Sequence, residues 1–303
     1  MVSSSTSIKD DVMSNIDGIS GHTHLVALLG NPTSHSLSPA IHNLSFKLLG
    51  IDTVYLCFDV NADELAGVMS GLRAMESWDG CNVTMPCKQA IIPHLDRLEG
   101  AAELMGAVNV VKKEGDTLVG YNTDGVGFMT NLRKHGVNAK GSRMVLIGPG
   151  GAGSAILVQA ALDGVASIEV FARDGGPSYH HAGDLAERVC ERTECTIELH
   201  DLDNEDDLRE CIQAADILVN ATSVGMGEGC TDSLVQPEFL TPDLVVADVV
   251  YHPRETQLIC DAKAKGCRVV PGLGMILEQA AAGEAIWYDA AMPVDEIAKS
   301  IFE

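Results

Sequence analysis

The stretch Met144-Val145-Leu146-Ile147-Gly148-Pro149-Gly150-Gly151-Ala152-Gly153 decides the fold of this chain. Its four apolar residues predict a buried strand, and the glycines that follow fit the pattern G-x-G-x-x-G at the start of an apolar helix. Glycine permits the tight turn and lets backbone N–H groups approach a pyrophosphate, which the N-terminus of the helix stabilises. The motif alone is a weak signal, because glycine turns between strands and helices are common. Between a strand and a helix, it predicts dinucleotide binding.

Short apolar runs alternate with helical stretches on both sides of this turn, which predicts an α/β fold with mostly parallel sheets. The doubly wound half is expected to continue with strands near 167–171, 196–199, 217–219 and 244–247. The first half is expected to contain strands at 25–29, 54–58, 80–84 and 107–111, with helices at 39–49 and 62–74. Further helices are expected after 122, at 275–288 and at 294–301.

Helix ends carry recognisable cap signals. Ser38 followed by Pro39 looks like an N-cap with proline in the first turn, and Gly50 stands where a left-handed glycine ends a helix. Thr123 or Asp124 is the expected cap of the helix after 122.

The length of 303 residues is long for one core and predicts two domains flanking a cleft, where small substrates usually bind. We expect a flexible leader at 1–23, a substrate-binding and catalytic α/β domain at 24–123 plus 274–303, and a Rossmann NAD(P)-binding domain at 124–273. The last helices would then pack on the first domain and make it discontinuous.

The formal net charge of −23 argues against a nucleic-acid partner, because phosphate binding relies on clustered Lys and Arg. The nine cysteines are odd in number and contain no CxxC pair, so they predict neither a disulfide framework nor a metal site. They are expected to be reduced thiols, mostly buried. The leader has no apolar segment of a signal peptide or membrane anchor, which favours a cytoplasmic protein without a membrane partner.

Two serines in the segment Asn31–Pro39 are candidates for binding a carboxylate. Ser36 and Ser38 are two residues apart and would point to one side of an extended chain, at the mouth of the helix that Pro39 opens. Backbone N–H groups and the helix dipole favour an anion there without a cation. The alternative is that Ser38 only caps the helix and Ser36 is a turn residue.

Lys88 is the candidate proton donor, because a ketone reductase needs an acid beside the carbonyl and this lysine follows a strand end. Asp124, in the segment Gly120–Gly125, could hold the lysine and share its proton. The alternatives are a solvated surface lysine and a helix cap. Asn109 is expected at the centre of an apolar strand, where its amide either is satisfied by backbone or faces substrate hydroxyls.

The strand after the glycine turn ends in Ala172-Arg173-Asp174, about 20 residues beyond the glycines, where an acidic residue binds the ribose hydroxyls of NAD. Asp174 would repel the 2′-phosphate of NADP, whereas Arg173 could attract it. The alternative is a solvated loop pair.

Taken together, these segments resemble the shikimate dehydrogenase family from Leu25 to the C-terminus. The resemblance lies in the order of eight motifs, which is highly specific: HSLSP at 35–39, NVTMPCK at 82–88, GAVN at 106–109, GYNTDG at 120–125, GPGGAG at 148–153, NATSVGM at 220–226, DVVYHPRET at 248–256 and GLGMILEQA at 272–280. The chain looks most similar to the quinate/shikimate dehydrogenase branch.

The resemblance implies a role for each matching residue. Lys88 and Asp124 would be the catalytic pair. The substrate would be bound by Ser36, Ser38, Thr84, Asn109, Asp124, Tyr251 and Gln279. The cofactor would be bound by Gly148, Gly150, Gly151, Ala152, Arg173, Asp174, Thr222, Val224, Gly272 and Met275. The reaction implied is the interconversion of shikimate, or quinate, with its 3-keto acid, in aromatic amino acid biosynthesis or in quinate catabolism.

One departure concerns the cofactor. NADP-specific members of this family usually carry Asn-Arg-Thr where this chain has Ala172-Arg173-Asp174, so NAD is the expected cofactor and NADP the alternative. Other functions left open are a dehydrogenase of another cyclic acid, such as aminoshikimate, and a sensor of quinate or shikimate without turnover. A homodimer is one of the oligomeric states that the sequence leaves open.

Overall fold

The computed structural model describes residues 18–302, which form two compact units. Unit 1 contains the described residues up to Leu98, Val108–Gly120 and the segment from Gly283 onward, and unit 2 contains Glu99–Ala107 and Tyr121–Ala282. Most of the leader expected at 1–23 lies outside the described residues. Contacts thus assign Glu99–Ala107 and residues 274–282 to unit 2, whereas the sequence suggested the substrate-binding domain for both.

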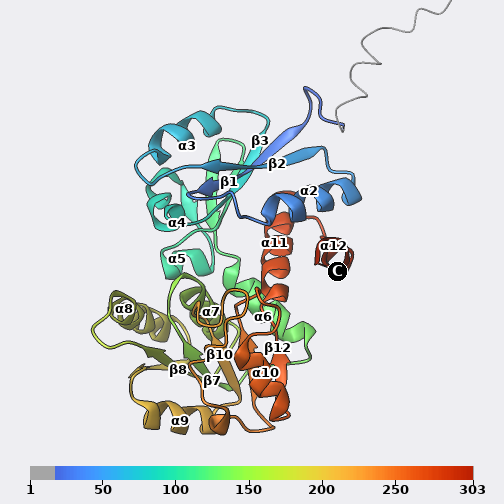
Figure 1. The fold of residues 1–303 in the computed structure, drawn as a ribbon. Helices are drawn as coiled ribbons and strands as arrows, with labels where there is room; N and C mark the ends of the chain where they lie inside the picture. Colours follow the sequence, from blue (N-terminus) through green and yellow to red (C-terminus); the bar gives the residue numbers. More distant parts are fainter. Residues whose placement is uncertain (1–17, 303) are drawn as a thin grey trace, which may run out of the picture. The chain divides into compact units, whose positions relative to one another are not determined.

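Unit 1 is a mixed sheet with helices (Figure 1). Its strand order is β2-β1-β3-β5-β6-β4, with β1 parallel to β2 and β3, and β3 antiparallel to β5. The strands are β1 (His24–Gly30), β2 (Thr53–Asp59), β3 (Trp78–Val83), β4 (Arg97–Leu98), β5 (Val110–Glu114) and β6 (Thr117–Tyr121). The helices are α2 (Ser38–Leu49), α3 (Leu65–Arg73), α4 (Cys87–Ala90) and α12 (Val294–Phe302), with a 3-10 turn at Ile92–His94.

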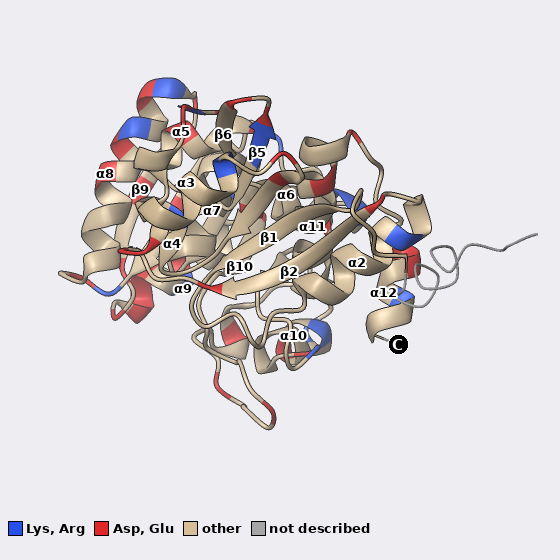
Figure 2. Cartoon of the chain, turned by 90° about the horizontal axis from the view of Figure 1, so that it is seen from above, with Lys and Arg blue, Asp and Glu red and all other residues tan. Residues whose placement is uncertain are grey.

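Charged residues are nearly absent from strands β1 and β2 of unit 1, although β1 is largely buried and β2 is not. Figure 2 shows β1 and nearly all of β2 without charged residues, whereas Lys, Arg, Asp and Glu lie on helices and at strand ends. A buried exception is Glu284 near the end of α11 (Leu273–Tyr288), which accepts hydrogen bonds from His42 (2.8 Å) and Ser45 (2.5 Å) of α2. The His42 ring also stacks on Tyr55 of β2. The hydrogen bond between His42 and Glu284 therefore ties the end of α11 to the sheet of unit 1.

Unit 2 is doubly wound, with strand order β12-β11-β10-β7-β8-β9 and every neighbouring pair parallel. Counted from β7, this is the order 3-2-1-4-5-6 of dinucleotide-binding folds. The strands are β7 (Arg143–Ile147), β8 (Ser167–Ala172), β9 (Thr196–Asp201), β10 (Ile217–Asn220), β11 (Val245–Asp248) and β12 (Arg268–Val270). The helices are α5 (Ala101–Met105), α6 (Asp124–Lys134), α7 (Gly151–Leu162), α8 (Pro177–Arg192), α9 (Glu205–Ala214), α10 (Gln257–Ala264) and most of α11, with a 3-10 turn at Pro237–Phe239.

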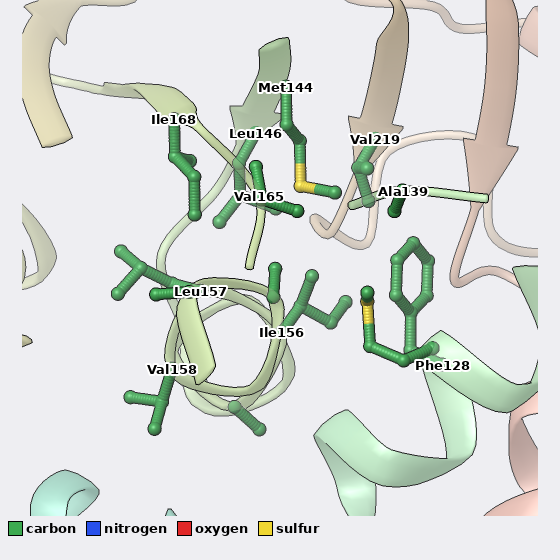
Figure 3. Packing of buried hydrophobic residues seen from close by; sticks show 14 of the residues in the cluster. Phe128, Ala139, Met144, Leu146, Ile156, Leu157, Val158, Val165, Ile168 and Val219 are labelled. Carbon is green, nitrogen blue, oxygen red and sulfur yellow. The ribbon is translucent and has the colours of Figure 1, made fainter. Parts of the chain in front are cut away.

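Both faces of the second sheet are covered, as its strands require. Along β7, Met144 and Leu146 point to a core that α6, α7 and α8 complete, whereas Val145 and Ile147 point to the other core, with residues of α9 and α10. Figure 3 shows Ile156 and Leu157 of α7 packed under Leu146 and neighbouring side chains of the first core. Continuous apolar runs such as 144–147 are what a parallel sheet buried on both faces needs.

The α/β fold with two mostly parallel sheets is confirmed, but several details differ. The strand expected at 107–111 is β5 (Val110–Glu114), which is antiparallel to β3. Leu37, not Ser38, is the N-cap of α2. Asn109 lies just before β5 rather than inside a strand. Gly50 is the left-handed C-cap, as expected. Thr123 is the N-cap residue of α6, although the Asp124 N–H donates to Oδ1 of Asn122.

The cysteines also differ from expectation. All nine are free, but only Cys81, Cys87, Cys195 and Cys267 are buried, so the expectation that most are buried was wrong. Among the described residues, no helix is both long enough and apolar enough to cross a membrane.

Glycine at position 153 is required by the close approach of β7 and α7. A Cβ atom on Gly153 would collide with the carbonyl oxygen of Gly148, whereas a Cβ on Gly151 would meet nothing within 4 Å. We therefore predict that Gly153→Ala lowers the stability of unit 2 by about 3 kcal/mol or more, since backbone cannot move aside as a flexible side chain can. Thermal unfolding should show a lower melting temperature for Gly153→Ala than for the matched variant Gly151→Ala. Equal melting temperatures would contradict this packing.

Candidate functional site

The loop after β1 carries the two serines and is held by Asp59 at the end of β2. The backbone N–H and the hydroxyl of Thr33 both donate to Oδ1 of Asp59, at 2.8 and 2.7 Å. These hydrogen bonds lower the pKa of Asp59 below its ordinary value, so the carboxylate stays ionised and keeps the loop in place. The Ser36 N–H donates to the Thr33 carbonyl, which passes the restraint on to the serines.

Ser36 and Ser38 lie together at the start of α2. The Ser36 hydroxyl accepts a hydrogen bond from the Ser38 N–H at 3.2 Å, and both residues are half-buried. The turn role considered for Ser36 is therefore real, but the capping role considered for Ser38 is not. A partner for the Ser38 side chain is Tyr55, with which it forms a hydrogen bond.

Tyr55 of β2 links Ser38 to the strand ends on the other side of β1. Its hydroxyl donates to Oδ1 of Asn82 at 2.6 Å, and Nδ2 of Asn82 donates to the Asn109 carbonyl at 3.1 Å. Burial raises the pKa of Tyr55 well above its ordinary value, although the Ser38 hydrogen bond partly opposes this, so the phenol stays a donor. A chain of four polar residues thus joins Ser38 to Asn109.

The segment after β3 positions Thr84 and Lys88. The Thr84 N–H donates to the Leu29 carbonyl at 2.9 Å, and the Cys87 N–H closes the turn onto the Thr84 carbonyl at 2.8 Å. Lys88 follows on the short helix α4, and its carbonyl accepts from the Val108 N–H next to Asn109. Both Thr84 and Lys88 are half-buried, which suits side chains that meet a ligand.

In unit 2, the glycine turn lies against the segment that follows β10. Gly148 has a φ of 90°, and its Cα is so close to the Thr222 side chain that no Cβ would fit. Gly150 is the N-cap of α7, and Cβ atoms on Gly150 and Gly151 would meet nothing within 4 Å. Because β7 and β10 are the strands where the winding reverses, this is the place where dinucleotides bind to such sheets. The residues present therefore fit a pyrophosphate.

The segment 220–224 is fixed by two buried polar side chains. Oδ1 of Asn220 accepts from the hydroxyl of Thr222 at 2.7 Å, and Nδ2 of Asn220 donates to the Val224 carbonyl at 3.2 Å and to Oδ1 of Asp248 at 3.0 Å. Oδ2 of Asp248 in turn accepts from the hydroxyl of Thr256 at 2.6 Å. Burial raises the pKa of Asp248, and these hydrogen bonds partly oppose the shift.

At the end of β8, Arg173 and Asp174 are both exposed. The Asp174 N–H donates to Oδ1 of Asp201, the last residue of β9, at 3.2 Å. Asp201 belongs to none of the motifs quoted from the sequence. The ends of β8 and β9 therefore bring the Asp201 carboxylate next to Asp174. Two carboxylates and one guanidinium, that of Arg173, lie in this region.

The remaining site residues of unit 2 lie on α6, on α11 and in the loop after β11. Asp124 is buried at the start of α6, and Gln279 of α11 is close to that helix, because a Cβ on Gly127 would be 2.6 Å from the Gln279 nitrogen. The N–H of buried Met275 donates to the Gly272 carbonyl at 3.0 Å. Tyr251 is half-buried in the loop after β11.

The structure thus brings together two groups of predicted residues. One, in unit 1, contains Ser36, Ser38, Thr84, Lys88 and Asn109, and the other, in unit 2, contains the glycine turn, Thr222 and Val224. The positioning residues Tyr55, Asn82, Asn220 and Asp248 were not predicted from the sequence, although the last three stand inside the quoted motifs.

Comparison with known proteins identifies the family of this chain. Residues 28–111 match the family described as the shikimate dehydrogenase substrate binding domain. The chain is 44% identical over 286 residues to a shikimate dehydrogenase (NADP(+)) of Listeria monocytogenes serotype 4b, covering 94% of this chain and 97% of the relative. The chain belongs to the shikimate dehydrogenase family.

Two solved structures are similar to this chain over more than nine tenths of its length. A Listeria monocytogenes shikimate 5-dehydrogenase in complex with shikimate and NAD is 43% identical, with a TM-score of 0.92 over 95% of this chain and 99% of that chain. A quinate dehydrogenase from Corynebacterium glutamicum in complex with NAD is 29% identical, with a TM-score of 0.81 over 92% of this chain and 98% of that chain.

Tyr55 should act as a positioning residue in this member of the shikimate dehydrogenase family. Replacing it in Tyr55→Phe removes the hydroxyl that holds Ser38 and Asn82, which is worth about 1 to 1.5 kcal/mol and predicts a KM for shikimate raised by about 5- to 12-fold, with a smaller change in kcat. Steady-state kinetics check this prediction.

The matched control is Tyr288→Phe. The Tyr288 hydroxyl is also partly buried in unit 1, but it bonds to Asp79 and Thr53 rather than to a predicted site residue. This variant should lose a similar amount of stability and keep its KM. A KM that rises equally in both variants would show that Tyr55 acts only through stability.

Proposed function

We propose that this protein catalyses the reversible, NAD(P)-dependent interconversion of shikimate and 3-dehydroshikimate. The observation that carries the proposal is the open glycine turn at the reversal point of the second sheet, in a chain whose first unit groups Ser36, Ser38 and Asn109 through hydrogen bonds at its strand ends. Membership of the shikimate dehydrogenase family supports the substrate class. The proposed pathway is aromatic amino acid biosynthesis, in the cytoplasm.

The proposed division into domains follows the roles. Residues 24–123 and 274–303 would form the substrate-binding and catalytic domain, and residues 124–273 the NAD(P)-binding domain, with Asp124, Tyr251 and Met275 each serving the ligand of the other domain. The substrate carboxylate would bind to Ser36 and Ser38, whose hydroxyls lie at the start of α2. The other groups proposed to bind the substrate are Thr84, Asn109, Asp124, Tyr251 and Gln279.

Lys88 and Asp124 are the proposed catalytic pair. In the direction of reduction, the Lys88 ammonium gives its proton to the carbonyl oxygen as the C–H bond forms, and Asp124 stabilises the ammonium form. In the direction of oxidation, the Lys88 amine takes the proton of the hydroxyl. A nicotinamide, when bound, supplies or accepts the hydride. Acid–base catalysis of this kind contributes typically about 10² to 10⁴ in rate.

The cofactor would be bound by the glycine turn and by the segments around it. Gly148, Gly150, Gly151 and Ala152 would contact the pyrophosphate, because the N-terminus of α7 favours an anion there. Thr222, Val224, Gly272 and Met275 would lie beside the nicotinamide. Arg173 and Asp174 would meet the adenosine ribose.

We further propose that NAD is preferred over NADP. Asp174 and Asp201 place two carboxylates in one loop pair, and both would repel a 2′-phosphate, whereas Arg173 alone would attract it. The Listeria structure at 43% identity is described as a complex with NAD, which agrees with this preference. The relative at 44% identity is named a shikimate dehydrogenase (NADP(+)), so the relatives do not agree on the cofactor. The proposal therefore rests on the charges of Asp174, Asp201 and Arg173.

The function is tested by an assay of NAD(P)H formation with shikimate or quinate and with NAD or NADP. We expect the highest kcat/KM for shikimate with NAD. A strong preference for NADP would refute the role given to Asp174. Tight binding of shikimate in calorimetry without any NAD(P)H formation would refute the proposal that the protein is a dehydrogenase. It would favour a sensor of shikimate.

The Lys88→Ala variant is the companion measurement for the chemical step. Its kcat should fall by about 10² to 10⁴ while thermal unfolding stays close to that of the parent protein. A near-parental kcat would overturn the assignment of Lys88.

A further inference from the structure

A second cluster of chemically active side chains lies in unit 2, on the edge strand β9 and its neighbours. Glu169 of β8, His200 of β9, and Asp207 and Cys211 of α9 converge there. The ligand atoms of Glu169, His200 and Cys211 all lie within 4.8 Å of one another. None of these residues belongs to the glycine turn or to the proposed substrate-binding residues.

His200 is the centre of the cluster, and both of its ring nitrogens face carboxylates. Nε2 lies 2.7 Å from Oε2 of Glu169, and Nδ1 lies 2.8 Å from Oδ2 of Asp207. Burial opposes a charge on the ring, but the two hydrogen bonds and the two negative charges outweigh it and raise the pKa of His200. The ring stacks on Phe171 with centroids 4.8 Å apart, which fixes its orientation.

Cys211 completes the set from one helical turn beyond Asp207. Its thiol lies 3.8 Å from Oδ1 of Asp207, and both residues are half-buried. Burial, followed by the negative charges of Asp207 and Glu169, raises the pKa of Cys211 to about 12. The thiol is therefore protonated at neutral pH, and only a strong cation would convert it to a thiolate.

We propose that this cluster is a binding site for a divalent transition-metal ion, with Zn²⁺ as the ion of choice. Glu169 Oε2, His200 Nε2 and Cys211 Sγ are the three protein ligands, and carboxylate, imidazole and thiolate are the ligands that Zn²⁺ takes in proteins. Asp207 accepts the Nδ1–H of His200 and so orients the ring, as carboxylates do for metal-bound histidines. Water fills the fourth position.

Binding of the metal with release of two protons leaves the net charge of the cluster unchanged. With a proton on each ring nitrogen of His200, as its contacts with two carboxylates favour, the metal-free cluster of Glu169, Asp207 and His200 carries one negative charge. Binding of Zn²⁺ releases one proton from His200 and one from Cys211, and the total is again one negative charge. The site therefore needs no further counter-ion.

Little movement is needed to bind the metal. Zinc bonds of about 2.0 to 2.3 Å in a tetrahedral arrangement put ligand atoms about 3.3 to 3.7 Å apart. The Glu169 oxygen would move away from Nε2, now at 2.7 Å, and the set of ligand atoms already lies within 4.8 Å. Because the residues come from β8, β9 and α9, the metal would tie α9 to the edge of the sheet.

The test is a titration of the full chain with Co²⁺, a spectroscopic substitute for Zn²⁺, followed by displacement with Zn²⁺. We expect one equivalent to bind with the absorption of a thiolate–cobalt bond and of tetrahedral geometry. Cys211→Ser should abolish the thiolate band, and Asp207→Asn should weaken binding by about 10- to 100-fold. Dehydrogenase activity should persist in Cys211→Ser, which shows that the variant is folded.

Cys260→Ser and Cys190→Ser are the matched controls, because these two thiols are exposed and lie on α10 and α8, helices that contribute no residue to the cluster. Both should keep the band and the stoichiometry. Absence of binding, or a band that survives in Cys211→Ser and disappears in a control, would overturn the proposal and leave His200 as a structural imidazolium. Neither result bears on shikimate turnover, which the assay of the previous section measures separately.

Discussion

The close contact of Gly148, Gly153 and Thr222 is the constraint on which the second unit depends. The turn between β7 and α7 has room for no side chain at positions 148 and 153, since one faces Thr222 and the other the Gly148 carbonyl. The same contact brings the N-terminus of α7 next to the segment after β10. A sheet wound from β7 in both directions therefore presents backbone N–H groups and the 220–224 segment at one edge.

Polar side chains buried at strand ends then shape each half of the candidate site. In unit 1, the hydroxyl of Tyr55 orders Asn82, and Asn82 holds the Asn109 carbonyl. In unit 2, Asn220 and Asp248 do the same for the segment that contains Thr222. Buried amides and carboxylates are costly unless every hydrogen bond is made, so these networks favour a single arrangement of the strand ends.

Much of the fold could be predicted from the sequence. An apolar run such as 144–147 followed by glycines indicates a buried strand and a tight turn into a helix. The strands β4 and β12 were missed, since two or three residues at Arg97–Leu98 and Arg268–Val270 carry no periodicity, and the five-residue strand β6 (Thr117–Tyr121) was missed as well. The cap at Ser38 was wrong because helix boundaries depend on local backbone geometry, here set by the Ser36 hydroxyl. The cluster around His200 could not be predicted, since Glu169 reaches His200 only because β8 pairs with β9, two residues away from Phe171, the register partner of His200, and Cys211 reaches it only through the packing of α9.

The most direct test of the central claim is a crystal structure of the protein with shikimate and NAD bound. The account predicts Nζ of Lys88 at about 3 Å from the hydroxyl that is oxidised, the carboxylate on the Ser36 and Ser38 hydroxyls, and the pyrophosphate on the N–H groups of Gly150 to Ala152. A complex in which Lys88 is remote from the nicotinamide, or in which the pyrophosphate avoids the glycine turn, would contradict it.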